Sequence, residues 1–173
     1  MQWRRDRLTV TSKWQAFVLP AVTRTFVIRL VGVTAGAWLL FGFVLLPFRV
    51  QGHSMAPTYR DGSFNFCNKW RYASAPPERR DVVAIRLAGE DIMLLKRVVA
   101  LAGETVAFRN GRLWVDGREV AEPYVQDPAP WNLAPRTVAP GKVYVVGDNR
   151  RVPMAVHMFG QTALNRIVGG PLW

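Results

Sequence analysis

Cysteine and histidine are scarce in this sequence. Its 173 residues include one cysteine, Cys67, and two histidines, His53 and His157. A single cysteine excludes an internal disulfide and a cysteine-rich metal site, and the two histidines lack the spacing of an HExxH zinc motif. The sequence therefore predicts chemistry by side chains alone, with no metal and no cofactor.

Acidic residues are also few. There are 12 Asp and Glu against 23 Lys and Arg, which gives a formal net charge of +11. Such a surplus can indicate nucleic-acid binding, but six of the basic residues fall within residues 1–29, where Asp6 is the only acid, and the rest are scattered in runs no longer than two. Basic residues ahead of an apolar stretch are typical of a membrane flank. We expect no nucleic-acid partner.

Charge is absent from residues 30–48, LVGVTAGAWLLFGFVLLPF. With the FVI before Arg29, the apolar run is long enough to cross about 30 Å of hydrocarbon as a helix. A cleaved signal peptide is the alternative, but the run exceeds a typical signal core and its end, LLPFRV, lacks a small-x-small cleavage site. The sequence predicts a retained transmembrane signal-anchor at 26–48, between a cytoplasmic basic tail, 1–25, and an extracytoplasmic domain, 49–173.

Convincing amphipathic helices are missing after residue 49. Short apolar segments alternate there with turns that contain Gly, Pro and charged residues, which predicts a mainly antiparallel β domain. RNGRLWVDGREV indicates a hairpin with two tight turns, whereas APPERR and QDPAPWNLAPR indicate long surface loops. The expected strands cover residues 63–67, 81–87, 91–101, 104–108, 112–116, 142–147 and 164–169.

The segment HSMAPT, residues 53–58, places Ser54 shortly after the apolar run. A serine hydroxyl needs a base before it becomes a useful nucleophile. In the expected strand IMLLKRVVA, apolar side chains flank Lys96 and Arg97 on both faces, so at least one cation should be partly buried. Only the lysine can lose its proton there. Lys96 is thus a candidate base, although an amine that extends to solvent past its own apolar stem is the simpler interpretation.

Five ordered segments resemble the boxes of bacterial type I signal peptidases: GHSMAPT, RRDVVAI, LLKRVVALAGETV, NGRLWVDGREVAEPY and APGKVYVVGDNR. The resemblance implies a signal-peptidase-like antiparallel β domain anchored in the bacterial inner membrane. It implies a serine endopeptidase that removes signal peptides after small-x-small sequences, with exported preproteins and the lipid bilayer as partners. By the same resemblance, Ser54 matches the nucleophile of the family and Lys96 matches its general base.

The resemblance also describes the surroundings of Ser54. Some relatives have a hydroxyl two residues before the nucleophile that helps to bind the oxyanion, and this sequence has Gly52 there. The backbone N–H of Ser54 is therefore the expected oxyanion donor. Gly52, Met55 and Pro57 are expected to line a groove in which the substrate pairs as an added strand.

The family pattern fails after GDNR, residues 147–150. Relatives usually continue with a serine, an aspartate, a second serine and an arginine before a glycine, in a segment that helps to hold the lysine. With Gly160 aligned, these positions hold Pro153, Ala155, Val156 and His157. Two alternatives therefore stay open. One is a specialised processing peptidase of a conjugative pilus or secretion system, and the other is an inactive relative that binds exported chains without cutting.

Three further features allow more than one interpretation. His157 is an alternative base, although nothing in the sequence fixes its ring, and His53 should point away from its neighbour Ser54. We interpret Asp148, in a GDN turn, as bonding its own backbone. The aromatic segment FNFCNKWRY, residues 64–72, indicates either contact with lipid headgroups or a core strand, with Cys67 as a small buried hydrophobe.

Overall fold

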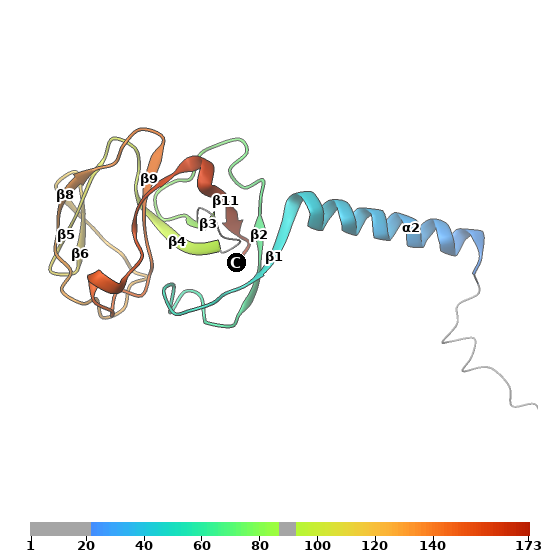
Figure 1. Cartoon of the computed structure of the whole chain (residues 1–173), viewed down its shortest axis with the longest axis horizontal. Helices are drawn as coiled ribbons and strands as arrows, with labels where there is room; N and C mark the ends of the chain where they lie inside the picture. The colour runs from blue at the N-terminus through green and yellow to red at the C-terminus, as the bar shows by residue number, and fades with distance from the viewer. Residues whose placement is uncertain (1–21, 87–92) are drawn as a thin grey trace, which may run out of the picture. The chain divides into compact units, whose positions relative to one another are not determined.

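The computed structural model describes residues 22–86 and 93–173. In these ranges an N-terminal helix is followed by strands that form two antiparallel sheets (Figure 1). The chain divides into two compact units, Met1–Leu40 and Phe41–Trp173. The predicted mainly antiparallel β class is confirmed.

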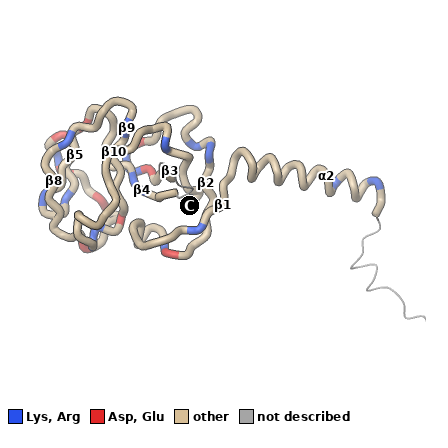
Figure 2. Tube along the Cα trace, viewed as in Figure 1, with Lys and Arg blue, Asp and Glu red and all other residues tan. Residues whose placement is uncertain are grey.

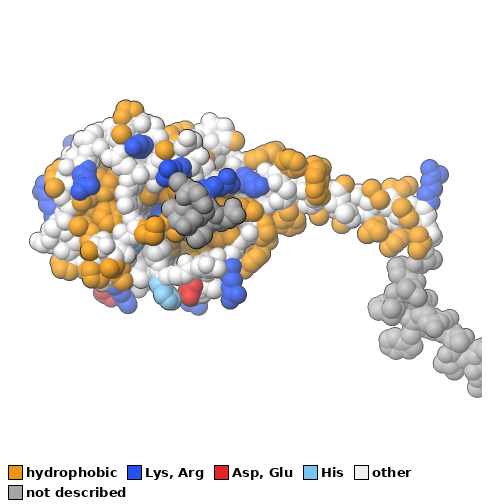
Figure 3. Space-filling view, viewed as in Figure 1, with side chains coloured by type: hydrophobic (Ala, Val, Ile, Leu, Met, Phe, Trp, Pro, Cys, Tyr) orange, Lys and Arg blue, Asp and Glu red, His pale blue; other side chains and the backbone are white. Residues whose placement is uncertain are grey.

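The helix α2 (Arg24–Leu39) begins after Thr23, whose hydroxyl accepts a hydrogen bond from the Phe26 N–H and caps the first turn. A π-helical turn, Leu40–Val44, extends it. No side chain of α2 is buried, and apolar side chains lie along it in Figure 3. The helical segment Arg24–Val44 is long and apolar enough to cross a membrane.

Residues 45–48, which we expected to complete the membrane helix, lie in a strand instead. β1 (Leu45–Arg49) pairs with β2 (Phe64–Asn68), and Pro47 stands opposite Phe66. Proline has no N–H for a helical hydrogen bond but is tolerated on an outer strand, and β1 is an outer strand of its sheet. The predicted helix boundary at 48 is therefore wrong, because the helical segment ends at Val44.

The larger sheet has the strand order β1-β2-β11-β3-β4-β9-β10, and the smaller sheet has the order β7-β6-β5-β8. Figure 2 shows basic and acidic residues scattered along these strands and their loops. The bounds not yet given are β3 (Val82–Arg86), β4 (Met93–Ala100), β5 (Thr105–Arg109), β6 (Arg112–Val115), β7 (Arg118–Val120), β8 (Leu133–Thr137), β9 (Lys142–Val146), β10 (Gly160–Ala163) and β11 (Ile167–Pro171).

Most predicted strands match observed ones, and the predicted hairpin is the β5-β6-β7 meander. Of the expected strand 91–101, residues 91 and 92 lie outside the described residues. Two predictions are wrong. The expected loop QDPAPWNLAPR contains the start of β8, an outer strand on which Pro135 is tolerated, and the expected strand 164–169 begins as a 3₁₀ turn, Leu164–Arg166, before β11.

Three apolar clusters stabilise the sheets. One surrounds Phe108 and Trp131 and includes residues of β4, β5, β6, β8 and β9. The second joins Met55, behind the Ser54 loop, to Leu95 of β4 and to Cys67, which is fully buried as predicted. The third packs side chains of β3, β4 and β9 against one another. In the aromatic segment 64–72, Asn65 and Cys67 are buried, as the core-strand interpretation predicts, while Phe64 and Trp70 are exposed. Contact of this segment with lipid headgroups stays a prediction. The site described next lies where β4, β9 and the Ser54 loop meet.

Candidate active site

Ser54 lies in the loop between β1 and β2, and this loop is held through its backbone. The Asn149 N–H donates to the Ser54 carbonyl at 3.0 Å, and the Asn149 side-chain amide donates to the His53 carbonyl at 3.0 Å. Behind Ser54, Met55 is buried in the apolar core. Neither the Ser54 hydroxyl nor its backbone N–H has a hydrogen-bond partner among residues 22–86 and 93–173. Both groups are free to engage a substrate.

Lys96 lies in β4 between β3 and β9, and its side chain is only 3% exposed. The interpretation in which its amine extends to solvent is therefore wrong. Its amine has no hydrogen bond or salt bridge within the described chain. Burial lowers the pKa of Lys96 from 10.5 to about 8, against the opposing effect of the Asp148 charge. Desolvation penalises the charged amine, so Lys96 becomes neutral at a far lower pH than an exposed lysine.

The pairing of β4 with β9 directs Lys96 toward Ser54. Arg97 stands opposite Val146, so the next pair in the register is Lys96 and Gly147. Opposite residues of an antiparallel pair carry their side chains on the same face. A Cβ atom on Gly147 would overlap the Ser54 carbonyl oxygen and would lie 2.6 Å from Cε1 of His157. The Lys96 side chain thus leaves its strand on the face where Ser54 and His157 lie.

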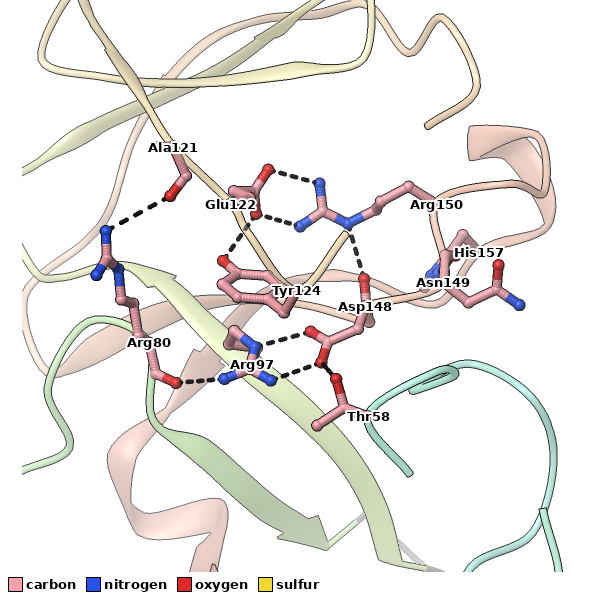
Figure 4. Close-up of polar contacts among 11 residues, drawn as sticks. Thr58, Arg80, Arg97, Ala121, Glu122, Tyr124, Asp148, Asn149, Arg150 and His157 are labelled. Carbon is pink, nitrogen blue, oxygen red and sulfur yellow. Dashed lines mark hydrogen bonds and ion pairs between the residues drawn. The ribbon is translucent and has the colours of Figure 1, made fainter. Parts of the chain in front are cut away.

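Asp148 joins the Lys96 strand to the Ser54 loop. It is fully buried, and its carboxylate accepts hydrogen bonds from Nε and Nη2 of Arg97 at 2.8 and 2.6 Å and from the Thr58 hydroxyl (Figure 4). Our interpretation of Asp148 as a residue that bonds its own backbone is therefore wrong. Its partners are 51 and 90 residues away in the chain, and a local sequence pattern contains no signal for them.

Arg150 stabilises the other side of the turn at residues 147–150. It is 1% exposed and forms a two-pronged ion pair with Glu122, at 2.6 and 3.1 Å, while its Nε donates to the Gly147 carbonyl at 2.7 Å. The Tyr124 hydroxyl also donates to Glu122, and the Tyr124 ring lies 4.0 Å from the Arg97 guanidinium carbon (Figure 4). These contacts connect the GDNR segment to the EPY sequence at residues 122–124.

A groove of about 660 Å³ opens beside Ser54. Gly52, Ser54 and Met55 line it, together with residues of β1 and the start of β4. Pro57 is not among the described residues that line it. The reason is that the chain turns immediately after Met55, and Pro57 faces solvent.

Comparison with known proteins decides the family. Residues 22–171 match the family model described as signal peptidase, peptidase S26. The chain belongs to this family.

Its relatives in the S26 family include signal peptidases from several bacteria. A probable signal peptidase I-1 from Synechocystis is 33% identical over 145 residues, which cover 79% of this chain and 74% of the relative. Signal peptidase I of Bacillus amyloliquefaciens is 35% identical over 144 residues, which cover 77% and 75%. The crystal structure of a signal peptidase I from Enterococcus faecalis is 25% identical, covers 54% of this chain and 95% of that chain, and has a TM-score of 0.45. The predicted resemblance is confirmed, and this S26 member is a serine endopeptidase.

The segment 153–159, which follows the last of the five resembling boxes, is held by apolar packing. Met154 and Phe159 pack against the cluster around Trp131, and the His157 ring meets the Trp131 ring edge-to-face, with centroids 4.9 Å apart. His157 Nε2 also lies 2.9 Å from the Asn149 carbonyl oxygen. The sequence pattern did not show what fixes His157, because its partners come from other parts of the fold.

Proposed function

We propose that Ser54 and Lys96 form the catalytic dyad with which this peptidase cuts signal peptides from exported preproteins. The observation that carries the proposal is the burial of Lys96, with no counter-ion at hydrogen-bond distance among residues 22–86 and 93–173, on the face where Ser54 lies. A neutral amine there accepts the proton of the Ser54 hydroxyl as the oxygen attacks the scissile carbonyl. The resulting ammonium then protonates the leaving amine.

The oxyanion of the tetrahedral intermediate needs a hydrogen-bond donor. The Ser54 N–H is suited to this role, because it belongs to the nucleophile itself and donates to no other group in the part of the chain that the structure describes. A preorganised donor of this kind stabilises charge that develops only in the transition state. The Asn149 contacts to the Ser54 and His53 carbonyls support this preorganisation by fixing the peptide groups on either side.

The groove supports binding of the substrate as an extended strand. It runs beside β1, which is an outer strand of the sheet formed by the described residues, and an extended peptide adds to such an edge through main-chain hydrogen bonds. Apolar side chains such as Phe48, Met55 and Leu95 line the groove. This lining suits the small side chains of a small-x-small cleavage site, with Gly52 allowing close approach of the substrate backbone.

The helical segment Arg24–Val44 serves in this proposal as a transmembrane anchor. It is apolar, and none of its α2 side chains is buried. Four basic residues precede it in the sequence, and two more, Arg24 and Arg29, lie near its N-terminal end. Basic flanks stay in the cytoplasm, so the catalytic domain faces the extracytoplasmic side of the bacterial inner membrane. The active site and its exported substrates then share a compartment.

The alternatives to a general signal peptidase differ in their support. An inactive binding protein gains nothing from a buried lysine that has no hydrogen-bond partner in the described part of the chain, because such a lysine costs stability. A peptidase dedicated to one pilus or secretion substrate uses the same dyad. Growth of a host that has lost its own signal peptidase, supported by this protein alone, would favour the general enzyme.

The test is cleavage of a preprotein with an Ala-x-Ala site by the full-length protein in detergent. Ser54→Ala and Lys96→Ala should each abolish cleavage. Ser74→Ala and Lys142→Ala change the same residue types at exposed positions outside the site and should cleave like the wild type. Cleavage retained by Ser54→Ala would refute the dyad.

A further inference from the structure

The His157 ring stands at the centre of the segment that has lost the polar residues of the family. It is 8% exposed, and its Nε2 lies 2.9 Å from the Asn149 carbonyl oxygen. A carbonyl can only accept, so Nε2 must carry the proton. Nδ1 is buried and has no hydrogen-bond partner among the described residues. An imidazole with this arrangement is a donor to Asn149.

Asn149 connects His157 to the Ser54 loop through hydrogen bonds. While its carbonyl accepts from His157, its N–H donates to the Ser54 carbonyl and its side-chain amide donates to the His53 carbonyl. Three hydrogen bonds at about 3 Å therefore connect the His157 ring to both peptide groups around the nucleophile. A shift of the ring displaces Asn149 and, with it, the Ser54 carbonyl.

The His157 ring is packed on two sides. Trp131 meets it edge-to-face with an interplanar angle of 78°, and Met154 and Phe159 anchor the segment in the same apolar cluster. On the other side, Gly147 leaves room for the ring, since a Cβ there would lie 2.6 Å from its Cε1 and 3.1 Å from its Nε2. His157, Asn149 and the Ser54 loop thus pack around a glycine that admits no side chain.

From this geometry we propose that His157 is a positioning residue, which holds Ser54 in its reactive place through Asn149 and replaces the polar residues missing at positions 153, 155 and 156. The inference rests on the Ser54–Lys96 dyad proposed above. His157 itself does not touch the substrate.

The charges around the ring favour a neutral histidine. Burial and the neighbouring charges of Lys96 and Arg150 lower the pKa of His157, against the opposing effect of backbone carbonyls at Asn149 and Met158. The ring therefore stays uncharged in the pH range where Lys96 loses its proton. The arginine usual in relatives would add a permanent cation beside Lys96 and Arg150, and Ala155 offers no carboxylate to pair with it.

The test compares three substitutions that separate the donor from the ring. His157→Gln keeps an N–H donor near the Nε2 position, so its kcat should stay within about threefold of the wild type. His157→Phe keeps the packing on Trp131 without a donor, and His157→Asn has an amide too short to reach. Both should lower kcat by about 10- to 100-fold with an unchanged KM, the cost of a misplaced nucleophile. Val156→Ala, at a position 73% exposed, is the control and should match the wild type.

Thermal unfolding of every variant, with Ser54→Ala in the same assay, separates the explanations. Equal kcat for His157→Gln and His157→Asn would overturn the positioning role, and this comparison holds even if His157→Phe does not fold. Equal losses of kcat in all three His157 variants, each with a lowered Tm, would mean that His157 only packs in the core. That result would also overturn the proposal. Activity in Ser54→Ala would instead refute the dyad itself.

Discussion

The loop that carries Ser54 receives hydrogen bonds from Asn149 on its backbone carbonyls, whereas Lys96 is buried in its strand and its amine has no hydrogen bond in the described chain. The loop needs geometric precision, because its hydroxyl must meet a carbonyl carbon. The lysine needs a dry environment, because only desolvation brings its pKa down to about 8. Nucleophile and base thus depend on different physical effects.

The turn at 147–150 serves both regions. Asn149 holds the Ser54 loop, Asp148 pairs with Arg97 next to Lys96, and Gly147 allows the close approach of the two. Asp148 also binds Thr58, so a single carboxylate ties the loop to the strand. The contrast between loop and strand leads to four predictions, of decreasing size.

The largest expected effect is the loss of activity in the variants Lys96→Met and Ser54→Ala. Each should lower kcat by at least about 1,000-fold, since a dyad fails without either member. Their stabilities should differ. Removal of a desolvated cation should raise the free energy of unfolding at pH 7 by up to about 3 kcal/mol for Lys96→Met, whereas Ser54→Ala should change it by less than about 0.5 kcal/mol.

The sign of this difference follows from proton linkage. The folded pKa of Lys96 lies below its unfolded value of 10.5, so between about 8 and 10.5 the unfolded state binds more protons and wild-type stability rises with pH. Urea unfolding in detergent at pH 7 and pH 10 should show the advantage of Lys96→Met shrink at the higher pH. If Lys96→Met were stabilised by the same amount at pH 7 and at pH 10, that result would contradict the lowered pKa of Lys96.

Asp148→Asn should break the connection between loop and strand. It leaves Arg97 buried without its counter-charge, and loss of one partner of a buried ion pair costs about 3 to 5 kcal/mol. Asp127→Asn is the matched control, because Asp127 pairs with Arg151 but is 84% exposed, and it should cost less than about 1 kcal/mol. Equal unfolding midpoints for the two variants would show that the connection is unimportant.

Gly147→Ala should disturb the loop more than the strand. The added methyl group overlaps the Ser54 carbonyl, so kcat should fall by about 10- to 100-fold through displacement of the nucleophile. Gly141→Ala, in the turn before β9, meets no atom within 4 Å and should cost about 1 kcal/mol of stability through its positive φ, with kcat unchanged. The idea fails if both variants cleave at the wild-type rate.

The smallest effect is the pH dependence of kcat/KM. Only neutral Lys96 can accept the serine proton, so the rate should rise with pH to a midpoint near 8 and fall about tenfold per unit below it. Initial rates of preprotein cleavage between pH 6 and 10 measure this midpoint. A midpoint near 10.5 would mean that Lys96 is hydrated in solution.

Local patterns predicted much of the fold. Alternating apolar residues and paired turn residues located most strands, and the apolar run located the helix. Two of the errors lie where prolines meet sheet edges, at Pro47 in β1 and Pro135 in β8, because an outer strand tolerates the missing N–H and a local pattern does not show which strands are outer. The third lies at residues 164–166, which form a 3₁₀ turn before β11. The resemblance supplied Ser54 and Lys96, and strand alternation alone left the exposure of Lys96 open.

The sequence by itself determined the apolar helix, the β class and the residue types available for a serine nucleophile and a lysine base, because these depend on composition and on periods of a few residues. Only the tertiary structure decided that Lys96 is buried, that Asp148 pairs with Arg97 and that His157 reaches Asn149. Desolvation and hydrogen bonding depend on the neighbours in space. Here those neighbours come from β3, β9 and the loop after β1, which are far apart in the chain.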